Sequence, residues 1–186
     1  MQTILRVGLV VGGLALIAAP SSAQQVPDKG MVAIGFTVGG SRETDDALSG
    51  GLELGAQVEG YLTPRVSIRG KVSSPWFDIV GRPFAGTIQP VATEGNLVYN
   101  WERGVWHPYV TGGVGFYHFR FTESGIDSSH TKGGVNFGGG AEYFLTRHDT
   151  ILGEATVRII PGRAFSANSD YETGYWTLAV GYKKYF

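Results

Sequence analysis

Apolar and polar residues alternate with a period of two along several stretches of this chain. In one of them Leu52 and Leu54 share one parity, while Glu53 and Gln57 share the other. The same alternation returns at 66–72, 135–143 and 151–159. A strand places successive side chains on opposite faces, whereas a helix repeats every 3.6 residues. The pattern therefore predicts an all-β chain.

We predict eight strands joined by connections that alternate in length. The strands are expected at 31–40, 50–62, 65–73, 89–101, 106–121, 132–145, 150–160 and 173–186. The connections at 62–65, 101–106 and 145–150 are short, and those at 39–49, 74–89, 122–131 and 161–172 are longer and polar. Short turns on one rim and long loops on the other are typical of bacterial outer-membrane barrels.

In the segment 106–121 the sequence does not decide which set of alternate side chains forms the apolar side. Tyr109 and Tyr117 compete with Val114 and Phe116 for the apolar side, and the glycines between them blur the choice. A β-bulge within this segment is a further alternative.

The first 23 residues have the layout of a signal peptide. A short region ending at Arg6 precedes an apolar run from Val7 to Ala19, and the small residues Ser21 and Ala23 fit the positions before a signal-peptidase cut. The apolar run is shorter than the roughly 20 residues that a membrane-spanning helix needs. We therefore predict a signal peptide at 1–23, one barrel domain at 24–186 and a location in the outer membrane.

The composition argues against a helical bundle and against nucleic acid as a partner. The chain has 29 glycines in 186 residues, and each would cost about 1 kcal/mol inside a helix. The net charge of −1 gives no basic surface for a phosphate backbone. The four histidines show no metal-ligand spacing and there is no cysteine, so we predict no metal and no cofactor.

Strand length and aromatic residues indicate that the apolar side faces lipid. Ten residues suffice to cross the apolar band of about 25 Å in a membrane barrel. Aromatic residues gather at both ends of the predicted strands, where two membrane interfaces would lie. Those beside the short turns are Tyr61, Tyr99, Trp101, Trp106, Tyr109, Tyr143 and Phe144, and those toward the long loops are Phe116, Tyr117, Phe119, Tyr171, Tyr175 and Trp176.

The last predicted strand ends on an aromatic residue. Its apolar parity is formed by Trp176, Leu178, Val180, Tyr182 and Phe186, and Lys184 departs from it. This pattern resembles the terminal-strand signal that the outer-membrane assembly machinery reads. That machinery is an expected partner, together with outer-membrane lipid and lipopolysaccharide.

The segments 108–116, 138–143 and 181–186 are rich in glycine and aromatic residues. They resemble the small outer-membrane β-barrel family, which includes OmpA-like and OmpX-like barrels. The resemblance implies a closed, antiparallel, up-and-down transmembrane β-barrel of about eight strands.

In a membrane barrel the charged parity of the strands must point inward. The predicted interior network comprises Glu53, Glu59, Arg69, Lys71, Glu94, Glu142, Glu154 and Arg158. An eight-stranded barrel is just wide enough for side chains to fill it, and isolated charges there would be costly. We therefore expect these residues to pair, to plug the lumen and to fix the strand register.

These features favour a non-enzymatic outer-membrane protein with a structural or surface-interaction role. A narrow porin-like channel is the first alternative, a lipid A-modifying enzyme is the second, and a soluble exported ligand-binding barrel is the third. A lipid A-modifying enzyme would need a site such as Ser128 and His130 with Glu142, although such residues are common in polar loops. The apolar loop residues Trp76, Phe77 and Phe84 are a candidate surface contact.

Overall fold

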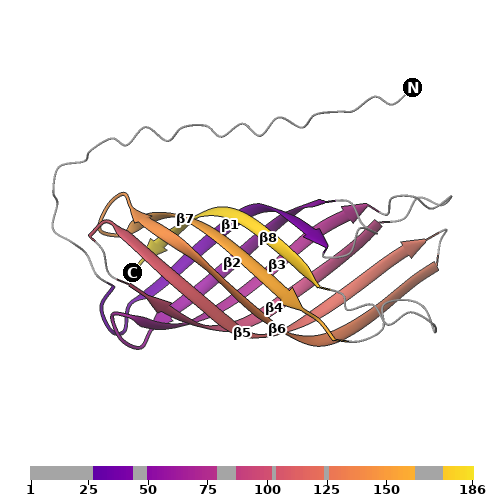
Figure 1. Cartoon of the computed structure of the whole chain (residues 1–186), viewed down its shortest axis with the longest axis horizontal. Coiled ribbons are helices and arrows are strands. Elements are labelled where there is room, and N and C mark those ends of the chain that lie inside the picture. Colours follow the sequence, from indigo (N-terminus) through magenta and orange to yellow (C-terminus); the bar gives the residue numbers. More distant parts are fainter. Residues whose placement is uncertain (1–26, 44–49, 79–86, 102–103, 124–125, 162–173) are drawn as a thin grey trace, which may run out of the picture.

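Eight antiparallel strands follow one another around a closed barrel, and β8 returns to pair with β1 (Figure 1). The computed structural model describes residues 27–43, 50–78, 87–101, 104–123, 126–161 and 174–186. The strands are β1 Val32–Glu43, β2 Gly51–Tyr61, β3 Val66–Asp78, β4 Thr87–Asn100, β5 Trp106–Glu123, β6 Ile126–Phe144, β7 Asp149–Ile159 and β8 Tyr175–Tyr185. The predicted fold class is confirmed. The described residues contain no helix of the length and apolarity that a membrane span requires.

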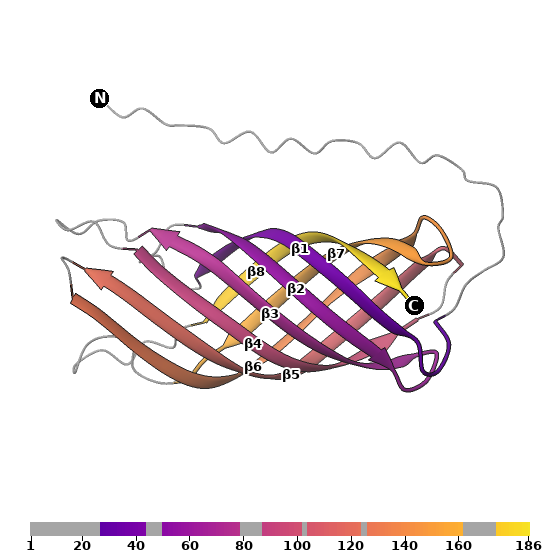
Figure 2. The same cartoon turned by 180° about the vertical axis from the view of Figure 1, so that it is seen from behind.

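The strand β6 begins six residues earlier than predicted, and β5 ends two residues later. They begin at Ile126 and end at Glu123, respectively, so the predicted loop at 122–131 is wrong and most of it is strand. The two strands stay paired from Trp106 opposite Tyr143 to Glu123 opposite Ile126. The resulting β5–β6 hairpin projects past β1 and β8 (Figures 1 and 2). We call this the hairpin end of the barrel, and the opposite end, with the turns at 62–65 and 145–148, the short-turn end.

The pairing of β5 with β4 and β6 settles its facing. Both registers run without interruption, so the strand contains no bulge. Tyr109 and Tyr117 are buried, whereas Val114 and Phe116 are 64% and 67% exposed.

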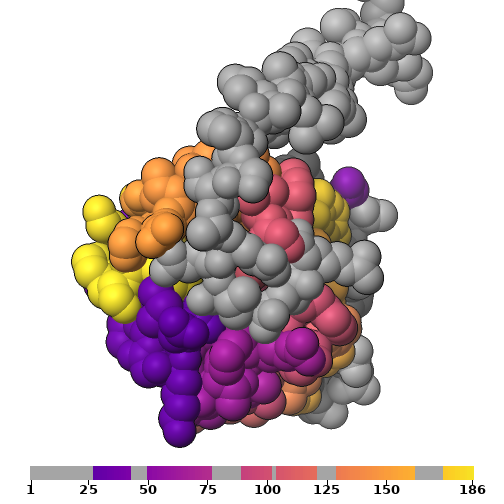
Figure 3. Space-filling model, turned by 90° about the vertical axis from the view of Figure 1, so that its left-hand side faces the viewer, coloured from indigo at the N-terminus to yellow at the C-terminus, as the bar shows by residue number. Residues whose placement is uncertain are grey.

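Large apolar side chains cover the outside of the barrel on every strand. Phe36 of β1 and Val180 of β8 are 63% and 64% exposed, as expected for a surface that contacts hydrocarbon rather than water. Seen along the barrel axis, the strands follow the order of the sequence around the rim (Figure 3).

The two predicted aromatic belts are only partly correct. Tyr99, Trp101, Trp106, Phe116 and Trp176 are exposed on the outer surface, and Tyr143 and Phe144 are half-buried. Five other members point into the barrel: Tyr61, Tyr109, Tyr117, Phe119 and Tyr175. A tyrosine near a strand end suits either face because its ring is apolar and its hydroxyl can reach a buried carboxylate. Tyr171 lies outside the described residues.

Candidate functional site

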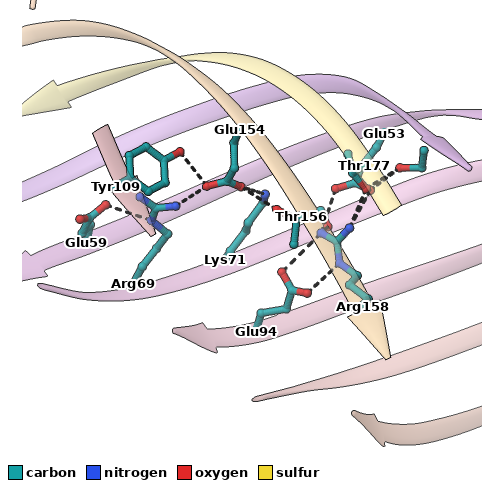
Figure 4. Close-up of polar contacts among 12 residues, drawn as sticks. Glu53, Glu59, Arg69, Lys71, Glu94, Tyr109, Glu154, Thr156, Arg158 and Thr177 are labelled. Carbon is teal, nitrogen blue, oxygen red and sulfur yellow. Dashed lines mark hydrogen bonds and ion pairs between the residues drawn. The ribbon is translucent and has the colours of Figure 1, made fainter. Parts of the chain in front are cut away.

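The lumen of the barrel is filled with charged side chains. Strand alternation sends the predicted residues inward from β2 (Glu53, Glu59), β3 (Arg69, Lys71), β4 (Glu94), β6 (Glu142) and β7 (Glu154, Arg158). Each of the eight is at most 6% exposed. The pairing between strands gathers them into two groups (Figure 4).

The inner cluster lies toward the short-turn end and consists of Glu59, Arg69, Lys71, Glu142, Glu154 and Lys183. Arg69 connects it, because its guanidinium lies 3.0 Å from Glu59 and also pairs with Glu154. The Lys71 ammonium lies 2.7 Å from the other oxygen of Glu154. Three carboxylates thus face three cations, and each carboxylate has at least one hydrogen-bonded cation. This arrangement offsets the cost of removing six charges from water.

The outer cluster lies toward the hairpin end and consists of Glu53, Glu94 and Arg158. The Arg158 Nε atom is 2.7 Å from Glu94, and its Nη2 atom is 3.1 Å from Glu53. Thr177 of β8 accepts a hydrogen bond from Arg158 Nη1 at 2.7 Å. One guanidinium therefore holds two carboxylates together across the lumen (Figure 4).

Lys183 belongs to the inner cluster although it is not among the residues predicted from the sequence. This residue is fully buried, and its ammonium lies 2.7 Å from Glu59 and also contacts Glu142. Its parity is opposite to that of Val180 and Tyr182, so the alternation that placed these two residues toward lipid would also have placed Lys183 inside. Lys184 does face outward, at 51% exposure and 4.0 Å from Asp149.

Aromatic residues close the lumen on both sides of the charged clusters. At the short-turn end Tyr61 and Tyr185 pack with Ala33, and their hydroxyls lie 3.0 Å apart. At the hairpin end Tyr117 and Tyr175 pack with Phe119, Ala92 and Ile160. Tyrosine hydroxyls also reach the clusters: Tyr185 donates to Glu142, Tyr109 to Glu154 and Tyr117 to Glu94.

Glycines facing inward make room for these side chains, and Gly140 of β6 shows the effect most clearly. A Cβ atom there would lie 2.8 Å from the Tyr109 hydroxyl and 2.1 Å from the Gly153 carbonyl oxygen. We expect Gly140→Ala to lower the free energy of unfolding by about 1–3 kcal/mol, because overpacking must move the backbone or Tyr109. Urea unfolding of the protein in lipid vesicles would measure the loss.

Gly153→Ala is the matched control for this substitution. Gly153 lies on the neighbouring strand β7 and faces outward, where an added Cβ would meet nothing within 4 Å. Equal losses for the two variants would show that inward packing is not what requires Gly140.

The residues predicted for surface contact and for the assembly signal lie on the outer surface or outside the described residues. Trp76 is 37% exposed at the hairpin end of β3. Phe77 belongs to β3 but its side chain lies outside the described part, and Phe84 lies outside it altogether. The predicted assembly residues Trp176, Leu178, Val180, Tyr182 and Phe186 all face outward from the last strand.

The structure does not bring together the residues considered for lipid A chemistry. Ser128 and His130 lie in the projecting part of β6, whereas Glu142 is buried in the inner cluster near the other end of the same strand. Twelve residues of strand separate His130 from Glu142, a distance of about 40 Å. Within the described residues no three His, Cys, Asp or Glu side chains are arranged to hold a metal ion.

Sequence comparison identifies the family. The sequence model described as "Outer membrane protein beta-barrel domain" matches residues 9–183. The chain belongs to this family. The resemblance expected from the sequence is thus confirmed, and the protein is an outer-membrane β-barrel. A search of curated protein sequences finds no match.

Solved structures of other outer-membrane proteins share the fold. Ail, the attachment invasion locus protein of Yersinia pestis, is 13% identical, with a TM-score of 0.60 over 85% of this chain and 99% of Ail. Neisserial surface protein A is 12% identical, with a TM-score of 0.62 over 84% of this chain and 96% of its own. OprG from Pseudomonas aeruginosa is 16% identical, with a TM-score of 0.58 over 88% and 99%. At these identities the likeness is one of fold.

Proposed function

We propose that this family member is a closed outer-membrane barrel with a structural or surface-interaction role, not a diffusion channel or an enzyme. The filled lumen is the observation that carries the proposal. The two clusters contain the buried side chains of Arg69, Lys71, Arg158 and Lys183 with their carboxylates. An ion crossing the barrel would have to break these pairs, and each break would leave a buried charge without its partner.

The β5–β6 hairpin supports a role outside the membrane. On its outer face the apolar residues Val114 and Phe116 give way to His118 and Arg120, which are exposed. The ladder between β6 and β7 ends at Val135 and Ile159, so no described strand pairs with 126–134 on that side. An open strand edge presents backbone donors and acceptors that an extended polypeptide could use. We place this hairpin on the cell surface, beyond lipopolysaccharide-bearing lipid, after export by the signal peptide at 1–23.

Planar-bilayer recording tests whether the lumen is closed. We expect purified protein to give no large, steady single-channel current, because the inner and outer clusters both block the path. Faster migration of the unboiled sample on detergent gels would show that the recorded protein is a folded barrel. Large, steady currents from such a sample would overturn the proposal in favour of the porin-like alternative.

A further inference from the structure

The rim at the short-turn end, outside the lumen, carries more basic than acidic side chains. Among its described residues the acids are Asp28 and Asp149. The bases outnumber them and are all exposed: Lys29, Arg65, Arg147 and Lys184. The turn between β4 and β5 adds one residue of each sign to the sequence of this rim, Glu102 and Arg103. The short-turn end is therefore a basic surface.

The four bases come from segments that neighbour one another around the barrel. Arg147 lies in the turn before β7, Lys184 lies in β8, and Lys29 precedes β1. A backbone hydrogen bond of 2.8 Å from Gly30 to the last residue of β2 holds Lys29 beside that strand, just before the turn that contains Arg65. Because β7, β8, β1, β2 and β3 pair in this order, the bases follow one side of the rim (Figure 3). We call these four residues the basic arc.

An aromatic residue on the outer surface places the basic arc at the level of the lipid headgroups. On β8 the Tyr182 side chain is 42% exposed, and Lys184 follows two residues later on the same face, nearer the rim. The Tyr182 hydroxyl donates to Asp149, whose carboxylate lies 4.0 Å from Lys184. Tyrosine and tryptophan collect at the interface between hydrocarbon and water. A cation one step beyond Tyr182 therefore lies among the headgroups.

Large apolar side chains alternate with the bases along the arc. Each is at least 49% exposed: Leu62 beside Arg65, Leu145 beside Arg147, and Phe186 beside Lys184. A surface that combines exposed apolar residues with bases suits the boundary between acyl chains and anionic headgroups. A polymer bound in water, such as peptidoglycan, would meet the same charges without needing the apolar residues. The alternation favours lipid as the occupant.

We propose that the basic arc binds anionic phospholipid headgroups in the periplasmic leaflet of the outer membrane. The short turns of outer-membrane barrels face the periplasm, which assigns the arc to that leaflet. Arg65 and Arg147 suit a phosphate because a guanidinium presents several donors in a planar fork. The acyl chains of the same lipid would then lie against Leu62 and Leu145. The barrel thus selects anionic lipid along the side formed by β7, β8, β1, β2 and β3.

Electron paramagnetic resonance of spin-labelled lipids tests this preference. The wild-type barrel in phosphatidylcholine vesicles should immobilise labelled phosphatidylglycerol about two- to fivefold more than labelled phosphatidylcholine, because one base near a membrane surface contributes up to about fivefold. High salt should reduce the preference, since the Debye length falls to about 3 Å at 1 M. Equal immobilisation of the two lipids at low salt would overturn the proposal without any variant.

Two matched triple variants locate the preference on the barrel. Replacing Arg65, Arg147 and Lys184 by glutamine should bring the phosphatidylglycerol preference close to one. Replacing three bases of the hairpin end by glutamine is the control and should leave it unchanged: Arg42, Arg120 and Lys132. A preference lost only in the control would assign anionic-lipid binding to the opposite end and overturn the proposal.

Sedimentation with purified peptidoglycan distinguishes the other occupant of the same surface. We expect the wild-type protein in detergent to remain in the supernatant. Co-sedimentation that the Arg65, Arg147 and Lys184 substitutions abolish, together with equal immobilisation of the two labelled lipids, would reassign the basic arc to the cell wall.

Discussion

Replacing Arg158 by methionine is expected to lower the free energy of unfolding by about 3–5 kcal/mol, because removing one partner of a buried ion pair leaves an uncompensated charge. Arg158 is fully buried and is the one cation in direct contact with Glu53 and Glu94 among the described residues. Methionine keeps much of the side-chain volume, so the loss should reflect charge rather than a cavity. Urea unfolding in lipid vesicles, followed by the fluorescence of the four tryptophans, would measure it.

Two further variants separate this electrostatic effect from a general loss of packing. Arg120→Met removes an exposed arginine from the β5–β6 hairpin and should change stability little. The double variant Arg158→Met with Glu94→Gln removes the stranded carboxylate as well as its cation, and should recover part of the loss. If the double variant is as unstable as Arg158→Met alone, the paired charge is not what makes Arg158 important.

The strand framework could be predicted from the sequence because it depends on local alternation. A period of two places Leu52 and Leu54 on one face and Glu53 on the other whatever the rest of the chain does. Once the apolar face is assigned to lipid, the buried position of each interior charge follows. The facing of β5 does not follow from the alternation, because its glycines carry no side chain to mark a parity.

The grouping of the charges could not be predicted, because it depends on pairing between distant strands. Glu154 meets Arg69 across 85 residues, and Glu53 meets Arg158 across 105. Those contacts depend on the register of every strand between them, which the hydrophobic pattern does not specify to the residue. The pairing that separates a balanced inner cluster from an outer cluster with excess acid is therefore a property of the closed barrel.

The length of the β5–β6 hairpin cannot be predicted from the sequence for a different reason. Its outer part, which includes Ser129, His130 and Thr131, has the composition of a polar loop. Outside the apolar band both faces of a strand meet water, so the alternation that identified the other strands is lost there. The ladder from Phe119 to Glu123 along β5 is nevertheless continuous.

Placing an arginine at Val180 tests the assignment of the apolar face, on which the whole interpretation of the lumen depends. Val180 is 64% exposed and lies midway along the outward parity of β8, between Trp176 and Phe186. We expect Val180→Arg to destabilise the barrel in lipid vesicles by about 2–4 kcal/mol, the cost of a cation near the bilayer midplane. Leu145→Arg is the control, because Leu145 is 53% exposed in the β6–β7 turn and the cost near the interface falls to about 0–1 kcal/mol. If the barrel folded instead in water with this face solvated, Val180→Arg would be as harmless as Leu145→Arg, and the charges in the lumen would need another explanation.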